Sequence, residues 1–144
     1  YVGKPLPEGA TWDQVVAAMK LANREVFPAL DEAGWQRFAR RLHRDVGGRP
    51  RMDYDPALAA TLAAVTPETP MPDLWAAFET LAGKPVQVLR GALSDLLTRE
   101  TTTKMAERHP GLDLVEVADE GHAPLLEDSA TLDAVVAFLD RVGA

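Results

Sequence analysis

Residues 85–117 read PVQVLRGALSDLLTRETTTKMAERHPGLDLVEV, and this segment sets the topology of the second half of the chain. Two short runs rich in β-branched and aliphatic residues, 86–90 and 112–117, each predict a strand. Between them a helix is predicted from about Thr98 to Arg108, ended by Pro110-Gly111. A strand, a helix and a second strand in this order form a parallel pair with a right-handed crossover.

A last helix follows a loop that runs to about Asp128. Its apolar residues recur at helical spacing: Leu132, Val135, Val136, Phe138, Leu139 and Val142. Two parallel strands alone make a poor sheet, because such a sheet needs both faces and its inner edge covered. We therefore expect an N-terminal segment of the same protein to supply further strands. Without that segment, we expect the open edge either to pair with another copy of the chain, which would give a homo-oligomer, or to drive aggregation.

Residues 1 to about 65 predict helices joined by turns rich in proline and glycine, without an alternating strand pattern. Thr11 and Gln14 form a capping-box pair at the start of the first helix. A second helix is predicted to begin near Asp31 or Glu32 and to end at Gly47-Gly48, where glycine tolerates a left-handed C-cap. Asp55-Pro56 predicts the start of a short third helix.

Prolines at 67, 70 and 72 interrupt regular structure, because proline cannot donate a backbone hydrogen bond. We place a boundary there, giving a helical region of residues 1–66 and an α/β region of residues 67–144. A helix over Asp73–Leu81, closed by Gly83, opens the second region.

Composition limits the functions that the chain can perform. A formal net charge of −7 and a pI near 4.9 argue against nucleic acid or an anionic membrane as partner. Cysteine is absent and only His43, His109 and His122 carry imidazole, so we expect no metal and no cofactor. No apolar run approaches the roughly 20 residues of a membrane span, and we expect a cytoplasmic protein. One basic run, Arg37, Arg40, Arg41, His43 and Arg44, fits the solvated face of a helix better than a phosphate site.

Two polar side chains follow the predicted strands where chemistry is expected. Asp95 comes just after the first strand and His122 just after the second. Ligands of open parallel sheets sit outside the carboxyl ends of the strands, and neighbouring strands end side by side. A carboxylate at Asp95 could therefore orient the imidazole of His122 and stabilise its protonated form. Taken singly, Asp95 could instead cap the next helix and His122 could be an ordinary surface residue.

These residues carry a family resemblance. The segment Val88-Leu89-Arg90-Gly91-Ala92-Leu93-Ser94-Asp95-Leu96-Leu97, then Glu120-Gly121-His122-Ala123-Pro124-Leu125 and a closing helix, resembles the C-terminal end of the α/β-hydrolase superfamily. The resemblance implies an α/β fold made of a helical cap, residues 1–66, followed by strand-helix-strand-helix of a parallel sheet. It also implies that Asp95 is the acid and His122 the histidine of a catalytic triad.

The nucleophile of that family sits in a Gly-x-Ser-x-Gly elbow, and no such pentapeptide occurs in this sequence. Ser94 belongs to the acid loop and Ser129 to the start of the last helix, so neither is proposed as the nucleophile. We expect the chain to be inactive by itself and the complete enzyme to cleave an ester or related acyl bond in a small hydrophobic substrate. A serine nucleophile would favour acyl chemistry, and an aspartate would favour epoxide or halide chemistry. A non-catalytic interaction module derived from this fold is the alternative.

The other histidines and the aromatic residues carry weaker signals. His109 is predicted to be an exposed helix end and His43 a helix-face residue. The larger aromatic side chains predict core rather than substrate contacts: Trp12, Trp35, Phe38, Trp75 and Phe78.

Overall fold

A computed structural model describes residues 6–55, 57–58, 60, 66, 69–70 and 72–143. It divides into two compact units, one within residues 1–24 and 30–72 and the other within 25–29 and 73–144. The units therefore separate after residue 72, whereas the sequence suggests a boundary after residue 66. The interpretation of residues 1–66 as a cap stays a prediction.

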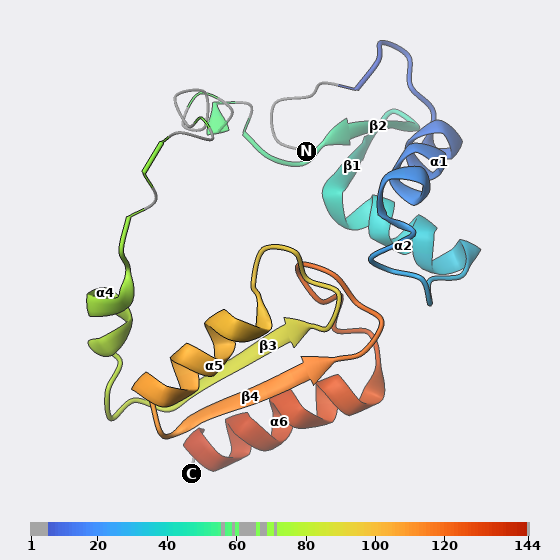
Figure 1. The fold of residues 1–144 in the computed structure, drawn as a ribbon. Coiled ribbons are helices and arrows are strands. Elements are labelled where there is room, and N and C mark those ends of the chain that lie inside the picture. The colour runs from blue at the N-terminus through green and yellow to red at the C-terminus, as the bar shows by residue number, and fades with distance from the viewer. Residues whose placement is uncertain are drawn as a thin grey trace. The chain divides into compact units, whose positions relative to one another are not determined.

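The first unit packs two helices against a small hairpin (Figure 1). Helix α1 spans Trp12–Asn23 and begins with the predicted capping box, in which Thr11 and Gln14 each accept from the other's backbone N–H. Helix α2 spans Glu32–Leu42 and is capped by Asp31, whose carboxylate accepts from the N–H of Gly34. Apolar side chains of both helices form the core of the unit: Val15, Val16, Met19, Trp35 and Ala39.

The hairpin is a feature that the sequence did not predict. Strands β1 (His43–Val46) and β2 (Arg49–Met52) pair antiparallel, with Val46 opposite Arg49. Gly47 and Gly48 have φ of +60° and +77°, the left-handed values that a two-residue hairpin turn requires. The prediction that these glycines cap a helix was therefore wrong. Val46 and Met52 are the large apolar residues of the two strands, so the alternation that reveals a strand is missing.

The hairpin also changes the interpretation of the basic run. Arg37, Arg40 and Arg41 lie on α2, but His43 and Arg44 lie on β1. The run is therefore not one helix face. The His43 side chain is buried rather than exposed on a helix, and its Nδ1 lies 2.9 Å from the carbonyl oxygen of Ala39.

The predicted third helix of this unit falls largely outside the described residues. Asp55 does accept a hydrogen bond from the N–H of Ala57, 2.9 Å away.

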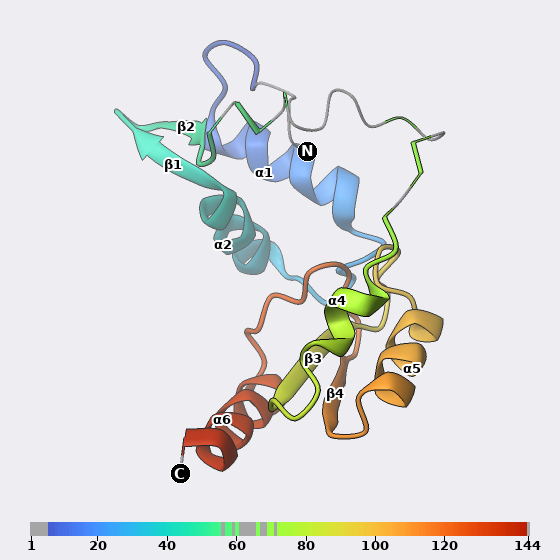
Figure 2. The same cartoon turned by 90° about the vertical axis from the view of Figure 1, so that its left-hand side faces the viewer.

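The second unit contains the predicted parallel pair. Strand β3 spans Val86–Gly91 and strand β4 spans Leu112–Val117, with registers from Val86 opposite Leu112 to Gly91 opposite Val117. Helix α5 (Arg99–Arg108) and helix α6 (Ser129–Gly143) lie on opposite faces of the two strands (Figures 1 and 2). The strand-helix-strand-helix order is therefore confirmed.

Helix α4 is shorter than the predicted helix over residues 73–81. It spans Trp75–Glu79 and packs against the end of α5. The Arg108 guanidinium lies 4.4 Å from the centre of the Trp75 ring and also pairs with Glu79.

His109 is the C-cap of α5, which agrees with the predicted helix end, but it is buried against α4, so the prediction that it is exposed was wrong. Its ring centre lies 6.2 Å from that of Phe78, and its Nε2 lies 3.2 Å from the carbonyl oxygen of Leu81. No hydrogen-bond partner of its Nδ1 is present within the described residues.

Helix α6 presents much of its apolar face to solvent in this structure. Its exposed apolar side chains lie along the helix: Leu132, Val136, Leu139 and Val142. No helix in the described part of the chain combines the length and the apolar character that crossing a membrane would take.

Candidate active site

The two loops that carry Asp95 and His122 leave the sheet at the same end. Strands β3 and β4 are parallel and end together at Gly91 and Val117. The loop after β3 contains Asp95, and the loop after β4 contains His122 (Figure 1). The topology thus places both candidate residues at the edge of the sheet where parallel sheets bind ligands.

Backbone hydrogen bonds join these loops directly. The N–H of Ala92 donates to the carbonyl oxygen of Val117 at 2.8 Å, and the N–H of Leu93 donates to that of Glu120 at 2.9 Å. The strand pairing therefore continues into the loops instead of stopping at the last strand residues. This continuation fixes the start of the Asp95 loop relative to the residues just before His122.

Gly91 makes this close approach feasible. A Cβ atom at that position would lie 2.1 Å from the carbonyl oxygen of Gly121 and 2.3 Å from that of Glu120. Both distances are far below a van der Waals contact, and the obstructing atoms belong to the backbone. A Cβ on Gly121 would in turn lie 2.9 Å from the Cβ of Val26. A side chain at Gly91, four residues before Asp95, or at Gly121, directly before His122, would thus collide with neighbouring atoms.

The side chain of Glu120 closes the loop that contains His122. One of its carboxylate oxygens accepts from the N–H of Leu125 at 2.6 Å. Leu125 is itself buried. Glu120 therefore ties the segment after His122 back to the segment before it, while its carbonyl oxygen holds the Asp95 loop.

The Asp95 loop is organised from within by Ser94 and Arg90. The hydroxyl oxygen of Ser94 accepts from the N–H of Leu97 at 3.0 Å, and Ser94 is buried. The Arg90 guanidinium donates to the carbonyl oxygen of Leu97 at 2.7 Å and approaches that of Ser94 at 3.5 Å. Ser94 therefore has a structural role in this loop, in line with its exclusion as a nucleophile.

Asp95 does not cap the helix that follows it. The N-cap of α5 is Thr98, whose hydroxyl oxygen accepts from the N–H of Thr101 at 3.1 Å. The alternative prediction, that Asp95 caps the next helix, was therefore wrong. Its carboxylate is exposed and remains available for another partner.

His122 is likewise exposed. Among residues 73–143, no hydrogen bond joins its side chain to that of Asp95. The structure brings their loops together, and the loop backbone is held by other residues.

From the sequence, no role was assigned to three residues that shape this site: Arg90, Glu116 and Glu120. The signals were present in the sequence, since Arg90 directly precedes the loop glycine and Glu120 directly precedes Gly121-His122. Glu116 could be linked to Arg90 only through the strand register, which places them opposite each other. No group of acidic and histidine side chains suited to a metal ion occurs in the residues that the structure describes.

Comparisons with known proteins identify the class of this fold. The chain has the fold of the C-terminal portion of an α/β-hydrolase. A crystal structure of an α/β-hydrolase from Novosphingobium aromaticivorans matches 99% of the chain with a TM-score of 0.84 and 37% identity, over 50% of its own length. E-2-(acetamidomethylene)succinate hydrolase matches in fold alone, with a TM-score of 0.66 and 22% identity over 48% of its length.

One curated relative carries a name that states its substrate. The chain is 39% identical to a 3-hydroxybutyrate-oligomer hydrolase of Cupriavidus necator, over 92% of this chain and 46% of that protein. No protein-family model matches the sequence. The chain spans about half the length of the relatives it matches. The resemblance drawn from the sequence is confirmed for the fold, and the relatives are hydrolases.

Proposed function

We propose that this chain supplies the acid, Asp95, and the histidine, His122, of an α/β-hydrolase catalytic triad. The supporting observation is the direct joining of their two loops, through the hydrogen bonds of Ala92 to Val117 and Leu93 to Glu120. Both side chains are exposed at the carboxyl end of the strands. The loops are held instead by Ser94, Arg90 and Glu120, which leaves Asp95 and His122 free for chemistry.

In the proposed reaction a nucleophile from an N-terminal segment attacks the carbonyl carbon of an ester. His122 accepts the proton of the nucleophile and then delivers it to the leaving alcohol. A water molecule, deprotonated by His122 in turn, releases the acid from the acyl-enzyme. Asp95 accepts a hydrogen bond from Nδ1 of His122 and stabilises the imidazolium. That contact forms as the site is completed, since catalytic hydrogen bonds are often long in ligand-free structures.

The N-terminal segment is also the partner that the surface of the second unit favours. Within the described residues, β3 pairs with β4 alone, so one edge of β3 is open. Leu132, Val136 and Leu139 of α6 are 45–56% exposed and lie along one stripe of the helix. Further strands beside β3 would pair this edge and cover apolar surface, at roughly 25 cal/mol per Å² buried. We also propose that residues 1–66 form the helical cap of the enzyme. The enzyme is proposed to be cytoplasmic.

Ester bonds of hydroxy acids are the first substrates to test. The relative from Cupriavidus necator is a 3-hydroxybutyrate-oligomer hydrolase. An oligomer of this kind is a chain of ester-linked hydroxy acids, which fits the acyl chemistry proposed for Asp95 and His122. A small hydrophobic ester, such as a p-nitrophenyl alkanoate, is the second class.

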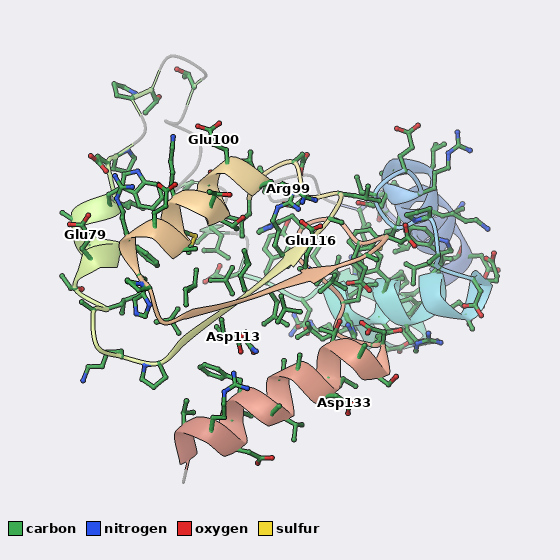
Figure 3. All side chains as sticks on the ribbon, turned by 60° about the horizontal axis from the view of Figure 1, so that its bottom comes forward. Glu79, Arg99, Glu100, Asp113, Glu116 and Asp133 are labelled. Atoms are coloured by element: carbon green, nitrogen blue, oxygen red, sulfur yellow. The ribbon has the colours of Figure 1, made fainter. Side chains whose placement is uncertain are left out.

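The test uses the complete gene product that contains this sequence. His122→Ala and Asp95→Asn are expected to lower kcat on p-nitrophenyl esters by at least about 10³-fold, with folding intact by circular dichroism. Asp133→Asn, an exposed aspartate on α6 (Figure 3), is the matched control and should keep wild-type activity. Full activity of His122→Ala would refute the triad. A wild-type protein without hydrolase activity on either substrate class would favour the interaction module instead.

A further inference from the structure

Arg90 is a buried charge at the end of β3. Its side chain is only 7% exposed. A guanidinium removed from water is costly unless each of its donors finds an acceptor. The acceptors it finds therefore show what the residue does.

Those acceptors lie in the Asp95 loop and on the neighbouring strand. Nε donates to the carbonyl oxygen of Leu97 at 2.7 Å, and Nη2 approaches that of Ser94 at 3.5 Å. Nη1 donates to Glu116, directly opposite on β4, at 2.9 Å. The two carbonyl groups come from residues on either side of Asp95, so one planar group holds the backbone before and after the candidate acid.

We propose that Arg90 is a positioning residue for Asp95, which sets the orientation of this carboxylate toward His122. The inference rests on the function proposed above and adds the residue that keeps the acid in place. The turn from Ser94 to Leu97, closed by its own hydrogen bond of 3.0 Å, is fixed to the sheet through Arg90. Arg90 lies on β3 and donates to Glu116 on β4. The Asp95 loop is therefore anchored to both strands.

Only an arginine fits this role. Its rigid fork carries donors that point in different directions in one plane, which suits acceptors on separate chain segments. A lysine could keep the ion pair with Glu116 but could not span both the carboxylate and the loop carbonyl of Leu97 with the same geometry.

A second arginine provides a matched control. Arg99 donates to the other carboxylate oxygen of Glu116 at 2.7 Å, and the two side chains lie together at the edge of the sheet (Figure 3). Its side chain is 74% exposed. Arg99 thus shares the acidic partner of Arg90, but no hydrogen bond from it to the Asp95 loop is present among residues 73–143.

The experiment measures kcat and KM of the complete gene product on a fluorogenic ester. Arg90→Met should lower kcat about 10–100-fold with KM changed less than about threefold, since a displacement of about 1 Å costs on that order. Arg90→Lys should lower kcat at least about fivefold, while its melting temperature stays close to that of the wild type. Arg99→Met should stay within about twofold of wild type.

A double-mutant cycle separates positioning from general stability. If Arg90 acts through Asp95, Arg90→Met should have little further effect on kcat in an Asp95→Asn background. Equal effects in both backgrounds would overturn the proposal, and so would unchanged kcat in Arg90→Met. If the methionine variant does not fold, the same cycle is run with Arg90→Lys.

The outcomes also distinguish the two proposals. An inactive His122→Ala beside a fully active Arg90→Met would overturn the positioning role alone. A fully active His122→Ala would overturn the proposed triad, and the role of Arg90 with it.

Discussion

Replacing Gly91 with alanine tests the close packing on which the candidate site depends. The added Cβ would lie 2.1 Å from the carbonyl oxygen of Gly121 and 2.3 Å from that of Glu120, so the two loops would have to separate. Separation would break the hydrogen bonds of 2.8 Å and 2.9 Å that the N–H groups of Ala92 and Leu93 donate. Each is worth about 1 kcal/mol, and displaced backbone costs about 1–3 kcal/mol more.

We therefore expect Gly91→Ala to lower stability by about 3–5 kcal/mol, a fall in Tm of about 6–20 °C if the unit unfolds like a domain of 150–250 residues. Gly143→Ala is the control, because nothing lies within 4 Å of a Cβ there. Thermal unfolding of the complete gene product, followed by circular dichroism, gives both values. A Tm for Gly91→Ala within about 2 °C of that for Gly143→Ala would refute the argument from close packing.

Two further predictions concern local structure. At the start of α6, hydrogen bonds from the side chain and backbone of Thr131 hold the pKa of the Asp128 carboxyl below its usual range. The charge of Asp128 therefore stabilises the fold above the unfolded-state pKa, and this contribution is lost as the pH falls through the lower folded-state pKa. Wild type should exceed Asp128→Asn in urea midpoint at pH 7 and lose that advantage near pH 2; an unchanged advantage would contradict the assignment. In the hairpin, Gly48 has φ of +77° with open space around it, so Gly48→Ala should cost about 1–2 kcal/mol by thermal unfolding. Gly48→Asn should cost less, because asparagine tolerates this conformation, and equal losses would point to another cause.

The second unit could be predicted from sequence because its signals are local. Strands β3 and β4 are short apolar runs bounded by Pro85, Gly91 and Pro110-Gly111. Their parallel pairing follows from the helix between them. Once both strands are placed, the positions of Asp95 and His122 follow as well.

The hairpin and the environment of two histidines could not be predicted in the same way. Residues 43–52 have only Val46 and Met52 as large apolar side chains, so no alternation of apolar residues marks β1 and β2. His43 and His109 are polar by type, yet they are buried because Ala39 and Leu81 place carbonyl oxygens beside their ring nitrogens. The partner of His109 lies 28 residues earlier in the chain and becomes apparent only after the chain has folded, whereas the partner of His43 lies four residues earlier.

The sequence alone determined the parallel strand pair and the placement of Asp95 and His122 after its two strands, because apolar runs and glycine or proline boundaries act over a few residues. Tertiary structure decided how that edge is held together. Gly91 meets the backbone of residues 120 and 121, Glu120 closes the His122 loop, and Arg90 reaches Leu97 and Glu116. The contacts of Gly91 with residues 120 and 121 and of Arg90 with Glu116 join segments about 26–30 residues apart, and they form only when two parallel strands bring the segments to the same end of one sheet.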